Sequence, residues 1–335
     1  MAHHTTTAEL PGNSWRDIVS RYNRPNISRS IWQMVNSIIP YMFLWFLMYE
    51  SLKISYWITL PLTMLAAGFL IRIFIIFHDC GHGSFFRSKK LNMIVGNFCG
   101  ILTFTPYERW TNSHKIHHQT VGNLDKRGTG DVWTLTVDEY LALSHSRKIF
   151  YRIYRNPLIM FGLGAYLIFM ITNRFTHRRM TWKQRWNIYF TNAAILLIAI
   201  GMSFLIGLKA FLLIQLPVMY FASIGGVYLF YLQHQFDDVI WSRQKDWDYK
   251  KMAMEGSSFF KLPGLLRWFS GNIGFHHIHH LGPTIPNYNL ARCHNENPVF
   301  RELKPITFFT SFKALKIKLW DEKLQRAVSF RDIPI

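Results

Sequence analysis

Long apolar segments alternate with short polar links along this chain. Four segments are long enough to cross about 30 Å of hydrocarbon as helices; they comprise residues 31–49, 54–77, 188–208 and 210–232. The first, third and fourth contain no Asp, Glu, Lys or Arg, and the second contains only Arg72. The links at residues 50–53 and around Lys209 are very short. The pattern therefore predicts an all-α integral membrane protein with four transmembrane helices in two hairpins.

Two further apolar segments, residues 91–107 and 157–172, are about as short as a spanning helix can be. The loop at residues 173–187 carries five basic side chains, whereas the hairpin tips carry almost none. The positive-inside rule places this loop in the cytosol and the tips outside. Residues 1–30 are polar and lack the apolar core of a secretory signal. They are expected to form a cytosolic N-terminal tail, which contains His3 and His4, ahead of one membrane domain at residues 31–335.

Histidines are concentrated in three clusters whose spacing suits one face of a helix. His78 and His82 are four residues apart, at the end of the second long segment. The other two clusters repeat a pattern of i, i+3 and i+4, which also shares one helix face; they are His114, His117 and His118, and His276, His279 and His280. A single His234 follows the fourth long segment, much as His78 follows the second.

Together these positions offer nine imidazoles. One zinc ion needs only three or four protein ligands, so nine suit two metal ions with open positions. Imidazole binds iron, zinc, copper and nickel, and the ligand type alone does not name the metal. The remaining histidines, His145, His177, His277 and His294, fit no shared face and are expected to be ordinary surface or core residues.

A shared metal centre also constrains the topology, because all clusters must lie on one side of the membrane. Only residues 91–107 lie between the first two clusters, so this segment cannot cross once. Between the second and third clusters, residues 157–172 would make the number of crossings odd and should not cross either. The prediction is four spanning helices and a cytosolic helical cap that holds a dimetal site.

Composition narrows the function classes. Of the 335 residues 50% are hydrophobic and only 17% charged, below the usual quarter for soluble domains. Three widely separated cysteines exclude a disulfide scaffold and an iron–sulfur cluster within the chain. The net charge of +19 is explained by positive cytosolic loops. Nucleic acid is not an expected partner, because the basic residues lie between apolar segments.

These motifs resemble those of the membrane fatty acid desaturases with three histidine boxes. The matching boxes are His78-Asp79-Cys80-Gly81-His82, His114 to His118 and His276 to His280. Flanking matches are Gly271 to Phe275, Leu281 to Tyr288, and Asn123 to Asp131. The resemblance covers roughly residues 31 to 330. It is closest to bacterial acyl-lipid desaturases of the Delta-5 phospholipid type.

The resemblance implies a non-haem di-iron centre and O₂ as co-substrate. It implies that the enzyme introduces a cis double bond into a saturated fatty acyl chain of a membrane phospholipid. It also implies a bacterial cell membrane, with the metal site on the cytoplasmic face. The family's metal ligands carry over to the eight box histidines, and His234 resembles its isolated extra ligand. Histidine ligands need acceptors on their second ring nitrogen; the candidates are Asp79, Asp125, Asp131, Asp237, Asp238 and Asn272.

The sequence contains no dinucleotide-binding glycine motif and no haem motif of a fused cytochrome b5. Electrons must therefore come from an external donor such as ferredoxin or flavodoxin. The motifs leave two other functions open. A fatty acyl or alkyl hydroxylase would use the same scaffold. A membrane metal transporter would place its ligands near the middle of the bilayer, whereas these boxes lie at helix ends or in polar loops.

Overall fold

A computed structural model describes residues 14–333. The described chain forms two compact units, each built from segments that are distant in the sequence. One unit, here called the helical unit, comprises Asn26–Ile116 and Leu143–Phe230. The other, the histidine-rich unit, comprises the described residues before Asn26, then His117–Ala142, and those from Tyr231 onward. His3 and His4 lie outside the described residues.

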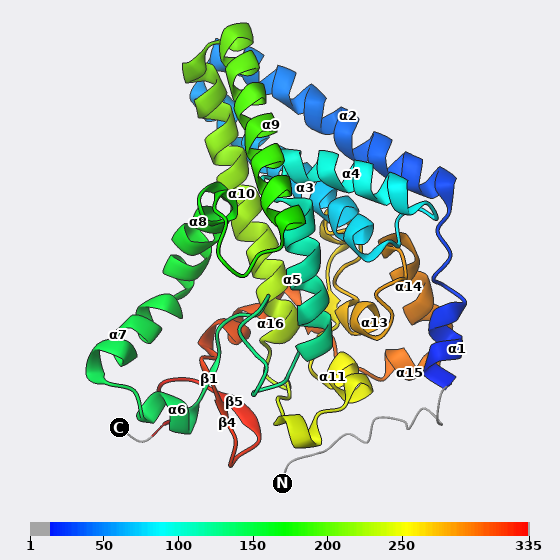
Figure 1. Cartoon of the computed structure of the whole chain (residues 1–335), viewed down its shortest axis with the longest axis vertical. Coiled ribbons are helices and arrows are strands. Elements are labelled where there is room, and N and C mark those ends of the chain that lie inside the picture. The colour runs from blue at the N-terminus through cyan, green and yellow to red at the C-terminus, as the bar shows by residue number, and fades with distance from the viewer. Residues whose placement is uncertain (1–13, 334–335) are drawn as a thin grey trace. The chain divides into compact units, whose positions relative to one another are not determined.

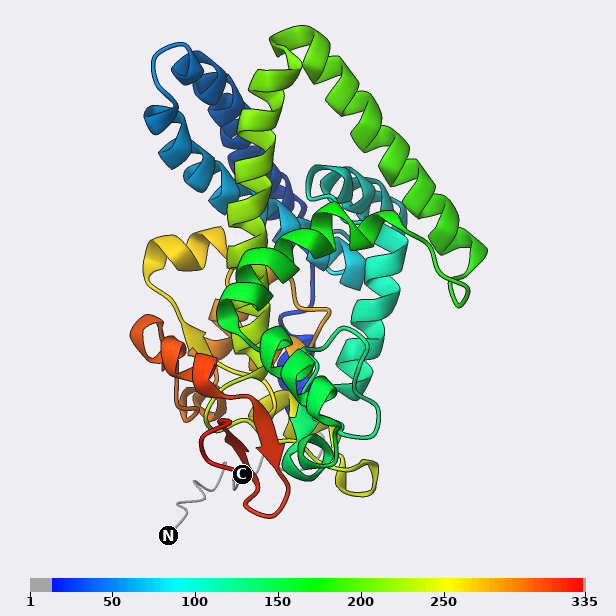
Figure 2. The same ribbon diagram turned by 90° about the vertical axis from the view of Figure 1, so that its left-hand side faces the viewer.

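Four helices of the described chain are long and apolar enough to span a membrane. They are α2 (Ile27–Leu52), α3 (Tyr56–His82), α9 (Trp182–Ile206) and α10 (Leu208–His234). The four predicted spans are thereby confirmed. Figure 2 shows α2 and α3 in blue as one hairpin, and α9 and α10 in green, joined at the top of the view and diverging from there.

The helices begin and end where local chemistry dictates. The Asn26 side chain caps α2 by accepting from the N–H of Arg29, and Ser55 caps α3 in the same way. Gly83 ends α3 in the left-handed conformation, with φ at 69°, which glycine adopts without steric cost. Gly207, with φ at 85°, separates α9 from α10.

The α2 helix buries several polar side chains and exposes apolar ones, the reverse of the usual arrangement in a soluble protein. Its buried face carries small and polar side chains, among them Ser30, Ser37 and Ser51. Ser51 Oγ lies 2.8 Å from Thr59 Oγ1 of α3, so the hydroxyl groups satisfy one another away from lipid. The exposed face is apolar and includes Trp32 and Phe43. Hydrocarbon solvates such side chains, which explains why they remain outside the packed interior.

The predicted shorter segments are helical but broken. Residues 91–107 form α4 (Lys89–Leu102) and then the start of α5 (Tyr107–Thr120). Fourteen residues of α4 cover about 21 Å, which is too short for a crossing. Residues 157–172 form a π-helical segment η1 (Leu158–Gly164), α8 (Ala165–Met170) and the start of η2 (Thr172–Arg174). With α7 (His145–Tyr154) they make a pair bent by 67°, which by length and composition is either a broken span or a re-entrant loop. That this segment does not cross stays a prediction.

Short helices and strands build the histidine-rich unit, some of which are labelled in Figure 1. The helices are α1 (Ser14–Ser20), α6 (Val137–Leu141), α11 (Tyr249–Glu255), α12 (Gly264–Phe269), α13 (His276–Leu281), α14 (Asn287–Glu296), α15 (Pro298–Arg301) and α16 (Phe308–Ser311), with the 3₁₀ turns η3 (Gln244–Asp246) and η4 (Phe312–Lys316). The strands are β1 (Leu135–Thr136), β2 (Phe260–Lys261), β3 (Ile306–Thr307), β4 (Leu319–Asp321) and β5 (Arg326–Val328).

Two small sheets hold this unit together. In the first, β4 pairs in parallel with β1 and antiparallel with β5. In the second, β2 and β3 are parallel, with Phe260 opposite Ile306. A buried cluster of Leu124, Val239, Trp241 and Trp320 packs beside them. The sheets tie the C-terminal residues to segments that precede them by more than 40 positions.

Candidate metal centre

Two spanning helices extend beyond their apolar segments and carry histidines in their last turns. Box one lies inside α3, which ends at His82, and His234 is the last residue of α10. We expected these residues just beyond the spans. The helices continue because each added residue still forms an i to i−4 hydrogen bond. The i, i+4 spacing therefore holds: the rings of His78 and His82 are 4.7 Å apart.

In the helical unit, His114 of α5 joins box one. Its Nε2 lies 3.1 Å from Nε2 of His78, and its ring centroid is 4.8 Å from that of His82. Their ligand nitrogens lie within 4.8 Å of one another. The Trp110 ring stacks on His114 at 4.3 Å, and Asp79 Oδ1 lies 3.1 Å from Nδ1 of His78. Three imidazoles are thus gathered and oriented within one unit.

In the histidine-rich unit, four buried histidines converge from three segments. They are His117, His234, His276 and His280, here called the buried tetrad, and one nitrogen of each lies within 4.8 Å of the others. Nε2 of His234 lies 3.0 Å from Nε2 of His117 and 3.0 Å from Nε2 of His276. His118 and His279 approach each other beside the tetrad, with Nε2 atoms 2.9 Å apart.

Hydrogen bonds from the second ring nitrogen fix the tautomers of two members of the tetrad, His117 and His234. Nδ1 of His117 donates to Asp131 Oδ1 at 2.6 Å, because a carboxylate can only accept. Nδ1 of His234 donates to the Gly256 carbonyl at 3.0 Å. In a neutral imidazole the other nitrogen then carries a lone pair. The two Nε2 lone pairs of His117 and His234 therefore face each other.

Facing lone pairs repel unless a cation lies between them, so this arrangement fits a metal. Nitrogens about 2.1 Å from one ion and at right angles around it are about 3 Å apart, as these are. His280 supports the same conclusion, since both of its buried ring nitrogens have no hydrogen-bond partner among the described residues. Burial, followed by the surrounding imidazoles, holds its pKa well below the ordinary value. A neutral imidazole is the form that binds metal.

The other acceptor candidates lie elsewhere. Asp125 forms an ion pair with Arg243 and accepts from the Gln244 N–H, so its carboxylate is occupied there. Asp237 is exposed, and Asp238 pairs with Lys304 at 3.5 Å. Asn272 donates to the Asn287 carbonyl. Of the six, only Asp79 and Asp131 are recorded in hydrogen bonds with histidine rings, because the other four are taken up by surface ion pairs, turns and backbone contacts.

The four histidines expected to be ordinary residues are also outside both metal groups found among the described residues. His145 and His177 are exposed. His277 turns away from its box and packs near His294, with ring centroids 5.6 Å apart. Burial lowers the pKa of His277 to about 3 and that of His294 to about 4, so both rings are neutral.

Two supporting groups were not anticipated from the sequence. Trp110 lies four residues before His114, a spacing that places both on one helix face and could have revealed it. The Gly256 carbonyl that accepts from His234 has no sequence signal, since every residue carries one. The grouping of four of the histidines into a tetrad was also unforeseen, because it depends on how three distant segments pack.

Comparisons with known proteins agree with this geometry. The fatty acid desaturase family model matches residues 55–311. A protein named fatty acid desaturase from Bacillus subtilis (strain 168) is 50% identical over 315 residues, covering 94% of this chain and 90% of that protein. An sn-1 acyl-lipid omega-3 desaturase (ferredoxin) from Nostoc sp. (strain 36) is 27% identical over 86% of this chain and 80% of its own length. With its boxes, spans and relatives in agreement, the chain is a desaturase enzyme that belongs to the fatty acid desaturase family.

Proposed function

We propose that this desaturase uses two iron ions and O₂ to introduce a cis double bond into a saturated acyl chain of a membrane phospholipid. The observation that carries the proposal is the convergence of buried imidazoles, with no carboxylate in the tetrad. Bound iron would supply the O₂ chemistry that an unactivated methylene C–H bond requires. The chain's own residues hold the ions, fix the imidazole tautomers and exclude water.

Each ion would have its own set of imidazoles. The buried tetrad would hold one ion, with Asp131 and Gly256 orienting two of its rings. The second ion would be held by His78, His82 and His114 of the helical unit. His118 and His279, whose Nε2 atoms are 2.9 Å apart, are proposed as further ligands. The α5 helix links the sets, because His114 precedes His117 by about one helical turn. The ligand roles of all nine residues belong to this proposal.

A phospholipid substrate is supported by the relatives and by the fold. The Nostoc protein is named an acyl-lipid desaturase, and so is a relative from Arabidopsis thaliana that is 28% identical over 72% of this chain. Four candidate spans support an enzyme that is embedded among such lipids. The Arg-rich loop at residues 173–187 supports a cytoplasmic metal site in a multi-pass cell membrane.

Electrons would come from a separate protein such as ferredoxin or flavodoxin. The name of the Nostoc relative includes ferredoxin and that of the Arabidopsis relative includes cytochrome b5, both electron carriers. The three cysteines of this chain are free and buried, which gives no ligand set for an iron–sulfur cluster. Its strong positive charge would attract an acidic carrier.

The test is to express the full chain in a host that lacks this activity and analyse phospholipid acyl chains by gas chromatography–mass spectrometry. The expected product is a new cis-unsaturated chain in the phospholipid fraction, made only in the presence of O₂. Purified protein from iron-supplied cells should contain about two irons per chain. Protein with one tightly bound zinc and no product would contradict the proposal.

A further inference from the structure

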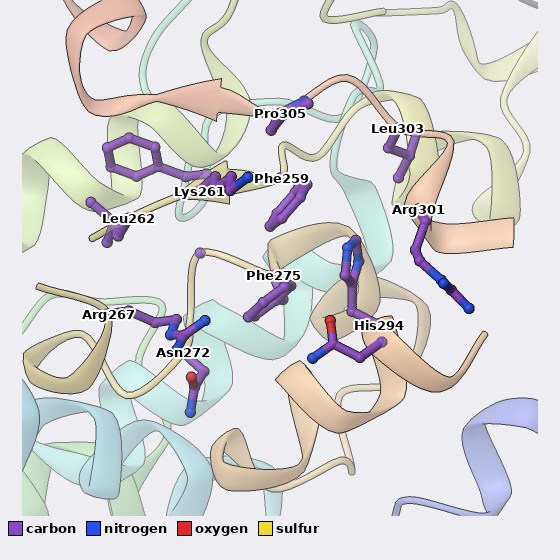
Figure 3. A pocket seen from close by; sticks show the side chains of 13 residues that line it. Phe259, Lys261, Leu262, Arg267, Asn272, Phe275, His294, Arg301, Leu303 and Pro305 are labelled. Carbon is purple, nitrogen blue, oxygen red and sulfur yellow. The ribbon is translucent and has the colours of Figure 1, made fainter. Parts of the chain in front are cut away.

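A cavity of about 300 Å³ lies in the histidine-rich unit, formed by residues around β2, α12 and α14. Three of its lining side chains are cationic: Lys261, Arg267 and Arg301. Figure 3 shows Lys261 and Arg267 on one side of the Phe259–Phe275 pair and Arg301 on the other. Among the described residues that line the cavity, none is acidic. Its chemistry therefore suits an anion.

A buried histidine in the cavity wall points to the same conclusion. His294 is 6% exposed and lines the cavity, where its ring packs on Phe259 at 4.4 Å. The ring forms no hydrogen bond with the described part of the chain, and its buried Nδ1 is unpartnered. A buried polar ring usually has a partner. An oxygen-bearing ligand in the cavity would provide one.

A backbone hydrogen bond connects the residue next to the cavity wall with the last turn of α10. The N–H of Ser258 donates to the Gln233 carbonyl in the last turn of α10 at 2.9 Å, and the next residue, Phe259, lines the cavity. The wall of the cavity is therefore connected by a backbone hydrogen bond to the turn that carries His234.

Exposed apolar side chains lie on α12, which contributes Arg267 to the cavity wall, and on α16. Leu265 of α12 is 69% exposed, and Phe309 of α16 is 83% exposed. Two residues separate β2 from α12, and β3 directly precedes α16. Because β2 pairs with β3, these two helices are linked through the sheet. Aromatic and aliphatic side chains beside cations are typical of a surface that lies in the membrane interface.

We propose that this cavity binds the phosphate group of a membrane phospholipid, while Leu265 and Phe309 insert between neighbouring acyl chains. Lys261 and Arg267 lie on the same side of the Phe259–Phe275 pair (Figure 3), where Arg267 can donate two parallel hydrogen bonds to phosphate and Lys261 adds a point charge. This inference rests on the proposed function where it takes the bound lipid to be substrate. Phe275 lines the cavity and directly precedes His276, so a lipid held there lies beside box three.

The experiment measures lipid binding to the purified full-length protein in a neutral detergent by calorimetry. The ligands are dihexanoyl phosphatidylglycerol, dihexanoylglycerol without phosphate, and inorganic phosphate. The test variant is Lys261→Gln/Arg267→Gln. The matched control, Lys313→Gln/Lys316→Gln, removes two charges from residues that do not line the cavity. A third variant, His294→Phe, replaces the imidazole with an aromatic ring that has no nitrogen atoms.

The test variant should bind the phospholipid at least about tenfold more weakly than wild type, because each charge-assisted hydrogen bond contributes substantially. The control should bind it as wild type does, and dihexanoylglycerol should not distinguish the proteins. His294→Phe should also weaken phospholipid binding. Equal binding by test and control variants would overturn the proposal. So would inorganic phosphate that binds as tightly as the lipid, which would identify a site for free anions.

Turnover assays separate this proposal from its alternatives. If the test variant binds lipid normally but loses activity only at limiting reduced ferredoxin, the cavity is a carrier site and the lipid proposal is wrong. Failure of the proposed function would look different, since wild type would then make no unsaturated chain in phospholipid. Iron content serves as a folding control and should be equal in all variants.

Discussion

Nε2 of His117 lies 3.0 Å from Nε2 of His234, although the two residues are 117 positions apart in the sequence. Asp131 and Gly256 hold the protons on the opposite nitrogens, so this contact joins two acceptors. Under the proposed function, this relationship would let a helix-end residue and a box residue bind one ion. It would also make the tetrad sensitive to groups that do not touch the metal.

Replacing His234 should abolish desaturation. His234→Ala removes a nitrogen that faces two other tetrad members, so product should fall on the order of a hundredfold or more, as for His118→Ala. The measurement is unsaturated fatty acid per unit of membrane-inserted protein. His145→Ala is the control, because this exposed residue begins α7 far from either group in sequence and should keep nearly full activity. Normal product from His234→Ala would show that His234 has only a structural role.

The two sets of histidines should lose metal independently. His117→Ala/His276→Ala removes half of the buried tetrad, and His78→Ala/His82→Ala removes box one. Each double variant should contain about one iron per chain instead of about two, measured by elemental analysis of purified protein. Retention of both irons in either variant would refute the assignment of ligands.

Asp131 should control iron affinity without being a ligand. Asp131→Ala removes the acceptor that fixes the tautomer of His117, and the expected loss of iron affinity is about tenfold to a hundredfold. Asp238→Ala is the matched control, since this exposed carboxylate contacts Lys304 and should leave affinity unchanged. Competition with a chelator provides the measurement. Equal affinities would show that the Asp131 hydrogen bond does not support the site.

Gly96 should be required for the close packing of α4 on α5. A Cβ at this position would lie 2.2 Å from the Tyr107 ring, whose hydroxyl donates to the Cys80 carbonyl. Gly96→Ala is therefore expected to destabilise the fold by about 1–3 kcal/mol. Gly201→Ala in α9 is the control, because nothing lies within 4 Å of its added Cβ. Thermal unfolding in detergent should show a lower midpoint only for the first variant.

Cysteine labelling tests the predicted sidedness. The native cysteines are buried, so single surface cysteines can be introduced without removing them. Lys115→Cys and Lys245→Cys should react with an impermeant reagent only from the cytosolic side, and Lys209→Cys only from outside. All three positions are exposed. Opposite labelling of positions 115 and 245 would contradict a shared cytosolic metal centre.

Much of the fold could be predicted because its determinants are local. Apolar length specified α2, α3, α9 and α10, and the i, i+4 spacing placed His78 beside His82. The π-helical segment at Leu158–Gly164 was not predicted, since its hydrogen-bond pattern leaves no distinct periodicity over seven residues.

The site was predictable at the level of residue type and less so in its connections. Asp79 and Asp131 contact histidines, whereas Asp125 pairs with Arg243. All three are acidic residues in or near the boxes, so sequence proximity could not separate them. Which carboxylate reaches an imidazole depends on packing between distant segments. The choice of the Gly256 carbonyl as the acceptor for His234 depends entirely on this packing.

The discontinuous origin of the tetrad has a consequence for biosynthesis. His117 leaves the ribosome well before α9 and α10, and His276 and His280 follow those helices. All four spanning helices are therefore synthesised before the last two histidines of the tetrad exist. Under the proposed function, iron could bind the complete tetrad only after these helices have been made. A nascent chain stalled between α10 and α13 would contain all four spanning helices and lack a complete tetrad.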